Sequence, residues 1–332
     1  MKLFSRRSLL ASALLAGLLP TSTLFAAEQP KELRIDWATY NPVSILLKDH
    51  GWLEKEFEKD LIKILWVQTL GSNKALEFLN AGSIDFGSTA GSAALLAKIN
   101  GNPIKSIYVF SKPEWTALVT RKDTTIKTVA DLKGKRVAVT RGTDPHIFLV
   151  RALQKAGLTE KDIVPVLLQH PDGETALIRG DVDAWAGLDP MMAQAEVRDG
   201  ARLFYRDADA NTYGILNVRE DFAKDHPDLV KRVLAVYETA RKYAIAHPDE
   251  VEKSFITATK LPKDIVEKQL RERTDLSNGT IGKAQRNTIL AAGLALQQAG
   301  VIKADVDVKQ TLDELIDTRF TVAASESQVK AR

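Results

Sequence analysis

Apolar residues along the 332-residue chain occur in short runs, and amphipathic stretches separate these runs. The run at residues 33–37 predicts a strand. Apolar positions from Val43 onward recur at helical spacing, and Asn41 followed by Pro42 is a typical helix start, with Asn as the N-cap. Strands that alternate with short helices in this way predict mostly parallel sheets flanked by helices.

The same alternation occurs twice along the chain, so we expect two α/β lobes. Residues 80–85 and 178–183 resemble each other, since each segment follows a short helix, enters a short strand and leads to a turn and a further helix. The C-terminal third, from about residue 221, has a mainly helical pattern. The expected strands lie at residues 33–37, 61–67, 84–86, 104–110, 137–139, 164–168 and 183–186.

Two lobes require connections, and the extended segments 114–120 and 214–218 are the candidates for chain that crosses between them. We expect a discontinuous first lobe, formed by residues 28–115 and 219–332 with the C-terminal helices, and a second lobe formed by residues 116–218. A ligand of such a protein lies in the cleft between the lobes, at the C-terminal ends of the strands.

Residues 1–27 have the pattern of a cleaved export signal. A basic start with the adjacent residues Arg6 and Arg7 precedes an apolar run at 9–19, and small residues end the segment. The run is short for a membrane span of roughly 20 residues, so an uncleaved anchor is the less favoured interpretation. The twin arginine leaves both Sec and Tat export open. We therefore expect a protein of the periplasm.

Composition and charge exclude several classes of function. The chain has no cysteine, which rules out disulfides, a Cys nucleophile and Cys-ligated zinc. The net charge of +3 comes wholly from the basic residues of segment 1–27, and a neutral remainder argues against nucleic acid as a partner. The histidines lack metal-ligand spacing, and no Walker or G-x-S-x-G sequence occurs, so we expect no metal, no cofactor and no enzyme.

Three turns that open helices form the candidate binding site. Backbone N–H groups at a helix start carry partial positive charge, glycine lets a ligand approach the backbone, and hydroxyl groups add donors. Each turn taken alone is more typical of an ordinary strand-to-helix connection, but together they indicate a site for a compact oxyanion. The turns are Thr39-Tyr40-Asn41, Gly87-Ser88-Thr89-Ala90 and Arg141-Gly142-Thr143.

Aromatic residues at strand ends and at the expected crossings are candidates to enclose an organic group. For Trp37 and Trp52, packing in the core or on the surface is the favoured interpretation. His146 lies beside the third turn, where a neutral imidazole can donate to an anion, although a structural histidine fits this position equally well. The aromatic candidates are Trp37, Tyr40, Trp115, Trp185 and Tyr213.

Three segments carry a family resemblance: residues 81–89 (AGSIDFGST), 126–138 (IKTVADLKGKRVA) and 185–190 (WAGLDP). In this order they resemble the periplasmic aliphatic-sulfonate-binding proteins of ABC importers, a group close to the taurine- and nitrate-binding proteins. The resemblance extends over roughly residues 32–320. It implies a type II periplasmic-binding fold, closure of the cleft on the ligand, and delivery of the ligand to a membrane permease.

The resemblance also implies ligand contacts from both lobes. The chain closely matches the family's first-lobe ligand loop, its second-lobe helix start and its W-A-x-x-D-P cleft segment. The match at the loop that contains Tyr40 and Asn41 is looser. Tyr213 joins these positions as an aromatic wall at the expected second crossing. The implied contacts are Tyr40, Asn41, Ser88, Thr89, Gly142, Thr143, His146, Trp185 and Asp189.

The chain departs from the family pattern at Asp144-Pro145, where the family often has small hydroxyl residues. An aspartate at a helix start competes with an anionic ligand for the same N–H groups. Two interpretations stay open: either Asp144 is turned away from the cleft, or the ligand has a cationic or neutral end.

The expected function is that of a monomeric solute-binding protein that captures a small organic sulfonate. A binder of taurine, nitrate, an aromatic acid or a thiamine pyrimidine precursor is the alternative of the same class. An enzyme on the same fold is an alternative of another class, because fold does not fix function. A third interpretation, a sensor domain, is less favoured because the sequence shows no helix-turn-helix or transmembrane segment.

Overall fold

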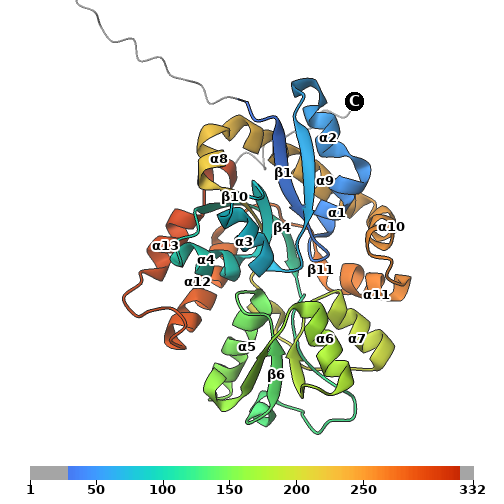
Figure 1. Cartoon of the computed structure of the whole chain (residues 1–332), viewed down its shortest axis with the longest axis vertical. Helices are drawn as coiled ribbons and strands as arrows, with labels where there is room; N and C mark the ends of the chain where they lie inside the picture. The colour runs from blue at the N-terminus through green and yellow to red at the C-terminus, as the bar shows by residue number, and fades with distance from the viewer. Residues whose placement is uncertain (1–28, 322–332) are drawn as a thin grey trace, which may run out of the picture.

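The computed structural model describes residues 29–321, which form two α/β lobes (Figure 1). Each lobe contains one sheet flanked by helices, which confirms the expected fold class. The expected export signal at residues 1–27 lies outside the described residues. Within residues 29–321, no helix is long and apolar enough to cross a membrane.

The sheet of the first lobe has six strands in the order β11-β4-β10-β3-β1-β2. β2 and β3 both run parallel to β1, whereas β10 lies between β3 and β4 and runs antiparallel to both. The strands are β1 (Glu32–Trp37), β2 (Lys63–Gln68), β3 (Phe86–Ala90), β4 (Ile104–Pro113), β10 (Gly214–Arg219) and β11 (Thr274–Asp275).

The sheet of the second lobe has five strands in the order β7-β6-β8-β5-β9. β6 runs parallel to β7 and β8, and β5 runs antiparallel to β8 and β9. The strands are β5 (Leu118–Thr120), β6 (Arg136–Val139), β7 (Val164–Leu167), β8 (Ala184–Ala186) and β9 (Arg202–Tyr205).

Helices follow most of the parallel strands, as the alternating pattern predicts. The first starts at the expected place, because the Asn41 side chain accepts a hydrogen bond from the Ser44 N–H and Pro42 is the first helical residue. The helices are α1 (Pro42–His50), α2 (Trp52–Phe57), α3 (Ser72–Asn80), α4 (Gly91–Ile99), α5 (Asp144–Lys155), α6 (His170–Arg179), α7 (Met191–Asp199), α8 (Glu220–Asp225), α9 (Pro227–Ala246), α10 (Pro248–Thr259), α11 (Lys263–Glu267), α12 (Lys283–Gln298), α13 (Val308–Leu315) and α14 (Thr318–Thr321).

The chain passes between the two sheets at residues 114–117 and again at residues 206–213. The two crossing segments touch, since the Thr116 N–H donates to Asn211 Oδ1 at 3.2 Å. The expected division at residue 115 falls within the first crossing segment. The expected division at residue 218 lies inside β10, a strand of the first sheet, so the topology moves the second division to the segment before Gly214.

One expected turn is instead a strand. Residues 87–90 were expected to form a turn, but they belong to β3, and α4 starts directly afterwards at Gly91. The physical reason is the pairing with β10, in which Ser88 lies opposite Leu216 and Thr89 opposite Ile215. A partner more than a hundred residues away is invisible to a local pattern, so small and hydroxyl residues here suggested a turn.

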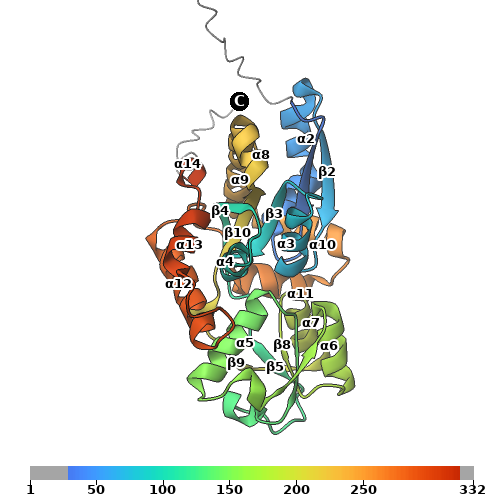
Figure 2. The same ribbon diagram turned by 60° about the vertical axis from the view of Figure 1, so that its left-hand side comes forward.

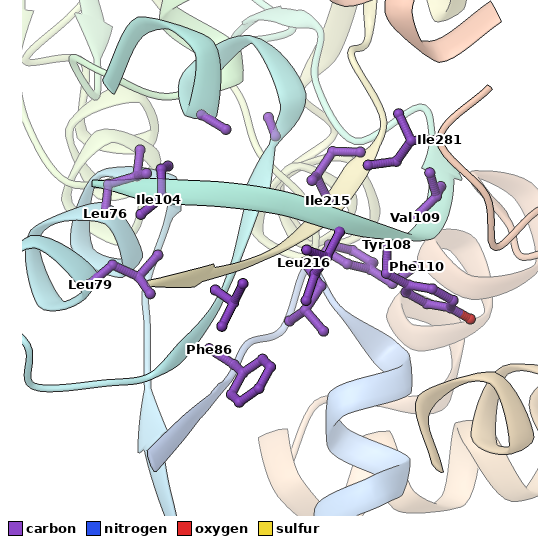
Figure 3. Packing of buried hydrophobic residues seen from close by; sticks show 14 of the residues in the cluster. Leu76, Leu79, Phe86, Ile104, Tyr108, Val109, Phe110, Ile215, Leu216 and Ile281 are labelled. Atoms are coloured by element: carbon purple, nitrogen blue, oxygen red, sulfur yellow. The ribbon is translucent and has the colours of Figure 1, made fainter. Parts of the chain in front are cut away.

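The core of the first lobe lies around β3, β4 and β10, where Phe86, Tyr108 and Leu216 are buried (Figure 3). β10 starts at a glycine because the Phe110 ring leaves no room for a side chain. A Cβ placed on Gly214 would lie 2.2 Å from that ring. The close approach lets the second crossing segment enter the sheet beside β4.

The core of the second lobe has two halves, one on each face of its sheet. Leu118 and Val137 belong to one half, and their neighbours Val119 and Ala138 belong to the other. This alternation is the period of two that strands impose on side chains. Trp185 of β8 is completely buried in the second half, so the aromatic residue expected in the cleft is part of the core.

Candidate ligand site between the lobes

A small cavity lies where the two lobes meet. The residues that line it come from the β1–α1 loop, the first turn of α3, the first crossing segment, the first turns of α5 and α6, and the loop after β8. Except for the crossing, these positions follow the carboxyl ends of strands, where ligands of open α/β sheets bind. The lining residues are Tyr40, Ser72, Trp115, Thr143, Asp144, Pro145, His170 and Leu188.

The cavity has a volume of about 10 Å³, which is just enough for one water molecule. A sulfonate group is several times larger, so a ligand can enter only when the lobes separate or side chains turn. Figure 2 shows how closely the lobes adjoin, with α11 above α7 and α12 beside α5. A hydrogen bond links α5 to α12 directly, since Gln154 Nε2 donates to the Ala295 carbonyl at 3.0 Å.

The starts of three helices meet at this cavity: α3 from the first lobe and α5 and α6 from the second. Their first N–H groups have no partner within the helix and carry partial positive charge, although Pro145 and Pro171 leave α5 and α6 with one N–H group fewer each. Gly142, just before α5, has φ +78°, a left-handed conformation that favours glycine. None of the eight lining residues is Lys or Arg, and one of them, Asp144, is acidic, so an anion held here would depend on helix ends and neutral donors.

Asp144, the position where the chain departs from its family pattern, is buried and accepts hydrogen bonds from three residues. Trp115 Nε1 donates to Oδ2 at 2.9 Å, and Ser92 Oγ donates to Oδ1 at 2.7 Å. Thr212 donates twice, from its N–H at 3.1 Å and from its Oγ1 at 2.6 Å. The N-cap residue of α5 is Thr143, and the donors to the Asp144 carboxylate come from other segments rather than from the N–H groups of the helix start. Of the two interpretations, these hydrogen bonds favour a carboxylate that does not compete for the N–H groups of α5, although Asp144 is one of the residues that line the cavity.

The expected first-lobe contacts belong to a network around the buried carboxylate of Asp36. Ser88 donates to Asp36 Oδ1 twice, from its N–H at 2.9 Å and its Oγ at 2.8 Å. Thr69 Oγ1 donates to Oδ2 at 2.8 Å. Burial raises the Asp36 pKa to about 6, although these hydrogen bonds lower it. The hydroxyl of Ser88 is therefore directed into the first lobe.

The other first-lobe residues surround this network. Asn41 Nδ2 donates to Ser88 Oγ at 2.8 Å, and Thr89 Oγ1 donates to the Ala90 carbonyl at 3.0 Å. Tyr40 lines the cavity, and its hydroxyl donates to the Ser88 carbonyl at 3.0 Å. The structure thus brings Tyr40 to the cavity and places Asn41, Ser88 and Thr89 behind it.

The expected second-lobe contacts divide in the same way. Thr143 lines the cavity and donates from Oγ1 to the Thr140 carbonyl at 2.6 Å, and Gly142 precedes it. His146 faces the interior of its own lobe, where Nε2 lies 3.1 Å from Glu160 Oε1. Trp185 is in the core, and Tyr213 packs into the core of the first lobe.

Asp189 is buried and forms an ion pair between the lobes. Its partner is Arg273, which precedes β11 and reaches Asp189 Oδ1 at 3.1 Å. Arg273 also pairs with Glu196 of α7. Burial raises the Asp189 pKa to about 6, and the Arg273 charge lowers it. Asp189 therefore contributes to the contact between the lobes, and nothing in the local sequence singled out Arg273.

Ser72 and His170 are the polar cavity residues that the sequence did not suggest. His170 is completely buried, and neither ring nitrogen has a hydrogen-bond partner. Burial lowers its pKa to about 3, so the imidazole is neutral. One signal was present: His170 follows an expected strand and precedes Pro171, just as Asp144 precedes Pro145 at the start of α5.

Two α/β lobes joined by two crossings, with a cavity at the strand ends between them, define the fold of type II periplasmic-binding proteins. Comparison with known proteins agrees with this class. The model of the family described as "NMT1/THI5 like" matches residues 48–251. The chain therefore belongs to the NMT1/THI5-like family.

Individual relatives are also similar over most of the chain. A putative aliphatic sulfonates-binding protein of Escherichia coli is 36% identical over 68% of this chain and 72% of its own. A putative aliphatic sulfonates-binding protein of Bacillus subtilis is 29% identical over 86% of this chain and 87% of its own. The solved structure of the alkanesulfonate-binding protein SsuA from Xanthomonas axonopodis pv. citri, bound to MOPS, has a TM-score of 0.78 at 27% identity and covers 86% of this chain and 99% of its own.

Proposed function

We propose that this protein is a solute-binding protein that captures a small organic sulfonate and delivers it to a membrane ABC permease. The observation that carries the proposal is a cavity between two lobes that three helix starts surround and no Lys or Arg lines. Such a site suits a singly charged, weakly hydrated head group better than a multiply charged anion. The similarity to proteins named for aliphatic sulfonates supports the same substrate class.

The organic part of the ligand would pack against aromatic rings. The rings of Tyr40 and Trp115 are 5.9 Å apart and meet edge to face on the cavity wall. Thr143 and the backbone after Gly142 would contact the ligand from the second lobe. Ser88 would hold the Tyr40 hydroxyl through its carbonyl, and Asn41 would hold the Ser88 hydroxyl. Thr89, His146, Trp185, Asp189 and Tyr213 would serve the packing of the lobes rather than contact the ligand.

The proposed mechanism is closure of the lobes on the ligand. A ligand that contacts both lobes stabilises the closed arrangement, because it binds that arrangement more tightly than the open one. A closed monomer in the periplasm would then present both lobes to the permease. The protein would carry out no chemistry on its ligand, as its relatives named above are binding proteins.

The proposal is tested by calorimetry and thermal shift with alkanesulfonates, taurine, sulfate esters, nitrate, an aromatic acid and a thiamine pyrimidine precursor. A bound ligand raises the unfolding midpoint by mass action. We expect a response to alkanesulfonates. A response to nitrate, the aromatic acid or the pyrimidine alone would replace the substrate class, and turnover of a bound sulfonate would show an enzyme instead of a carrier.

A further inference from the structure

The imidazole of His170 lies across the interface between the lobes. The residue starts α6 in the second lobe, yet its ring packs against Gly71, the residue before α3 in the first lobe. A Cβ placed on Gly71 would lie 3.1 Å from His170 Nε2. The ring is completely buried and lines the cavity. A buried polar ring between two lobes is therefore in position to contact whatever binds there.

Several polar atoms in this place lack a partner. Both ring nitrogens of His170 and Oδ1 of Asn73 are buried without a hydrogen bond. Asn73 Oδ1 faces the same side of Gly71, since a Cβ on Gly71 would lie 2.9 Å from it. Leaving a polar group buried and unpaired is unfavourable, and such groups need an explanation. One explanation is a ligand that supplies the missing hydrogen-bond partners.

The start of α3 supplies donors beside the same cavity. Ser72 and Asn73 are the first residues of this nine-residue helix, whose Lys74 and Ala75 N–H groups bond to the Gly71 carbonyl. The N–H groups of Ser72 and Asn73 have no carbonyl within the helix to bond. Ser72 lines the cavity, and its Oγ accepts a hydrogen bond from the Ala90 N–H at 3.0 Å. Its hydroxyl hydrogen therefore remains available as a further donor.

We propose that the start of α3 and the His170 imidazole together form the oxyanion pocket, which holds the singly charged head group of the ligand. One ring N–H of His170 donates to a ligand oxygen from the second lobe. Ser72 and Asn73 donate from the first. The inference rests on the proposed function and adds to it the residues that hold the head group, in place of Ser88 and Thr89.

The charges around the pocket define the class of head group. Asp144 lines the same cavity, and no lining residue is Lys or Arg. The other polar lining residues besides His170 are Tyr40, Ser72, Trp115 and Thr143, and all four are neutral. Burial lowers the pKa of His170 to about 3, so its ring supplies one donor and no charge. A second negative charge on the ligand would lack compensation, so sulfonates bind and doubly charged phosphonates or sulfate do not.

The first experiment compares 1-butanesulfonate with butylphosphonate by calorimetry on the whole protein. The sulfonate is singly charged at all pH values used, whereas the phosphonate is doubly charged at about pH 9 and singly charged at about pH 5.5. We expect the sulfonate to bind at both pH values and the phosphonate only at the lower one. Equal binding of the two at the higher pH would overturn the single-charge assignment.

The second experiment replaces His170 by Phe, which keeps the shape of the ring and removes both nitrogens. Loss of one hydrogen bond to a charged group weakens binding about ten- to a hundred-fold. His170→Asn, which keeps a neutral donor, should recover part of this loss. The matched control is His247→Phe, because His247 also precedes a proline at a helix start but is exposed. We expect this control to bind as the unaltered protein does.

Stability separates a ligand contact from a structural histidine. His170→Phe removes unpaired polar atoms, so the unliganded variant should unfold at an equal or higher temperature. A second variant, Gly71→Ala, adds only a methyl group in the pocket and should also weaken binding, because Gly71 has an extended backbone that alanine adopts. Unchanged sulfonate affinity in both variants would overturn the pocket while leaving the proposed function intact. Absence of sulfonate binding to the unaltered protein would instead overturn the proposed function.

Discussion

The indole of Trp115 donates a hydrogen bond of 2.9 Å to the carboxylate of Asp144. Trp115 belongs to the first crossing segment, and Asp144 is the first residue of α5 in the second lobe. The same carboxylate accepts two hydrogen bonds from Thr212 of the second crossing segment. One side chain thus ties the start of α5 to both segments that connect the lobes.

Asp144→Ala should destabilise the protein by about 2–4 kcal/mol, because it leaves several buried donors without an acceptor. Chemical denaturation of the unliganded protein measures this loss. The matched control is Asp228→Ala, since Asp228 also lies beside a proline in a first helical turn but is exposed. That control should cost less than about 1 kcal/mol. Equal losses in the two variants would contradict the role assigned to Asp144.

Ser88→Ala should reduce stability and leave sulfonate affinity within about threefold. The hydroxyl of Ser88 donates to the buried Asp36 carboxylate, so its removal costs about 1.5–3 kcal/mol. Denaturation and calorimetry on the same preparation separate the two effects, and the exposed residue Ser277 provides a control with Ser277→Ala. An affinity that falls tens-fold without loss of stability would show that Ser88 contacts the ligand directly.

Arg273→Met should destabilise the protein by about 3–5 kcal/mol at pH 7.5, because it leaves Asp189 buried without its cation. The pKa of Asp189 is already raised to about 6, and loss of the arginine raises it further. The folded state then binds a proton more readily than the unfolded state. The variant should therefore regain stability as the pH is lowered from 7.5 to 5.5.

The double variant Asp189→Asn, Arg273→Met completes this test. It removes the unpaired carboxylate, so it should be more stable than Arg273→Met alone at pH 7.5 and should lose the dependence on pH that this carboxylate causes. A double variant as unstable as the sum of its parts would show that the two residues act independently.

The stability of the unaltered protein should fall more steeply on acidification than that of His170→Phe. The pKa of His170 is about 3 in the folded state and 6.5 in the unfolded state, so the unfolded state binds one more proton between these values. Above pH 6.5 the His170 ring is neutral in both states and has no effect through protonation, whereas between pH 6.5 and pH 3 its protonation in the unfolded state lowers the stability of the unaltered protein. The difference between the two proteins should change by about 2 kcal/mol between pH 7 and pH 5. A constant difference would show that the His170 imidazole is not buried in solution.

Carboxylates whose pKa is raised by burial change stability in the opposite direction. Asp36 and Asp189 have pKa values of about 6, so they favour the folded state as the pH falls toward 4. These residues are present in both proteins. Their contribution cancels in the comparison with His170→Phe, which is why the difference is the quantity to measure.

Local sequence was sufficient for much of the fold. Asn41-Pro42 marked the start of α1, and the alternating strands and helices indicated two α/β lobes. These features depend on neighbours a few residues apart, so a pattern reveals them. The same local reasoning led to Tyr40 and Thr143, which line the cavity because they follow strand ends.

Features that depend on distant partners were not visible in the sequence. The hydroxyl of Ser88 appeared free for a ligand because its acceptor, Asp36, lies on another strand. Asp189 appeared available for the same reason, since Arg273 comes 84 residues later. His170 was one of several scattered histidines until the fold brought it against Gly71. Burial and pairing are properties of the tertiary structure, and a residue type does not reveal them.

The position of β10 has a consequence for the order of folding. During synthesis, which starts at the N-terminus, β3 and β4 are made long before β10, the strand that lies between them in the sheet. The second lobe, in contrast, is one uninterrupted stretch from β5 to β9. It can complete its sheet while the first lobe still lacks a central strand. The first lobe thus begins earlier in the sequence but is completed last. Until β10 has been synthesised, the edges of β3 and β4 that pair with it have no partner strand.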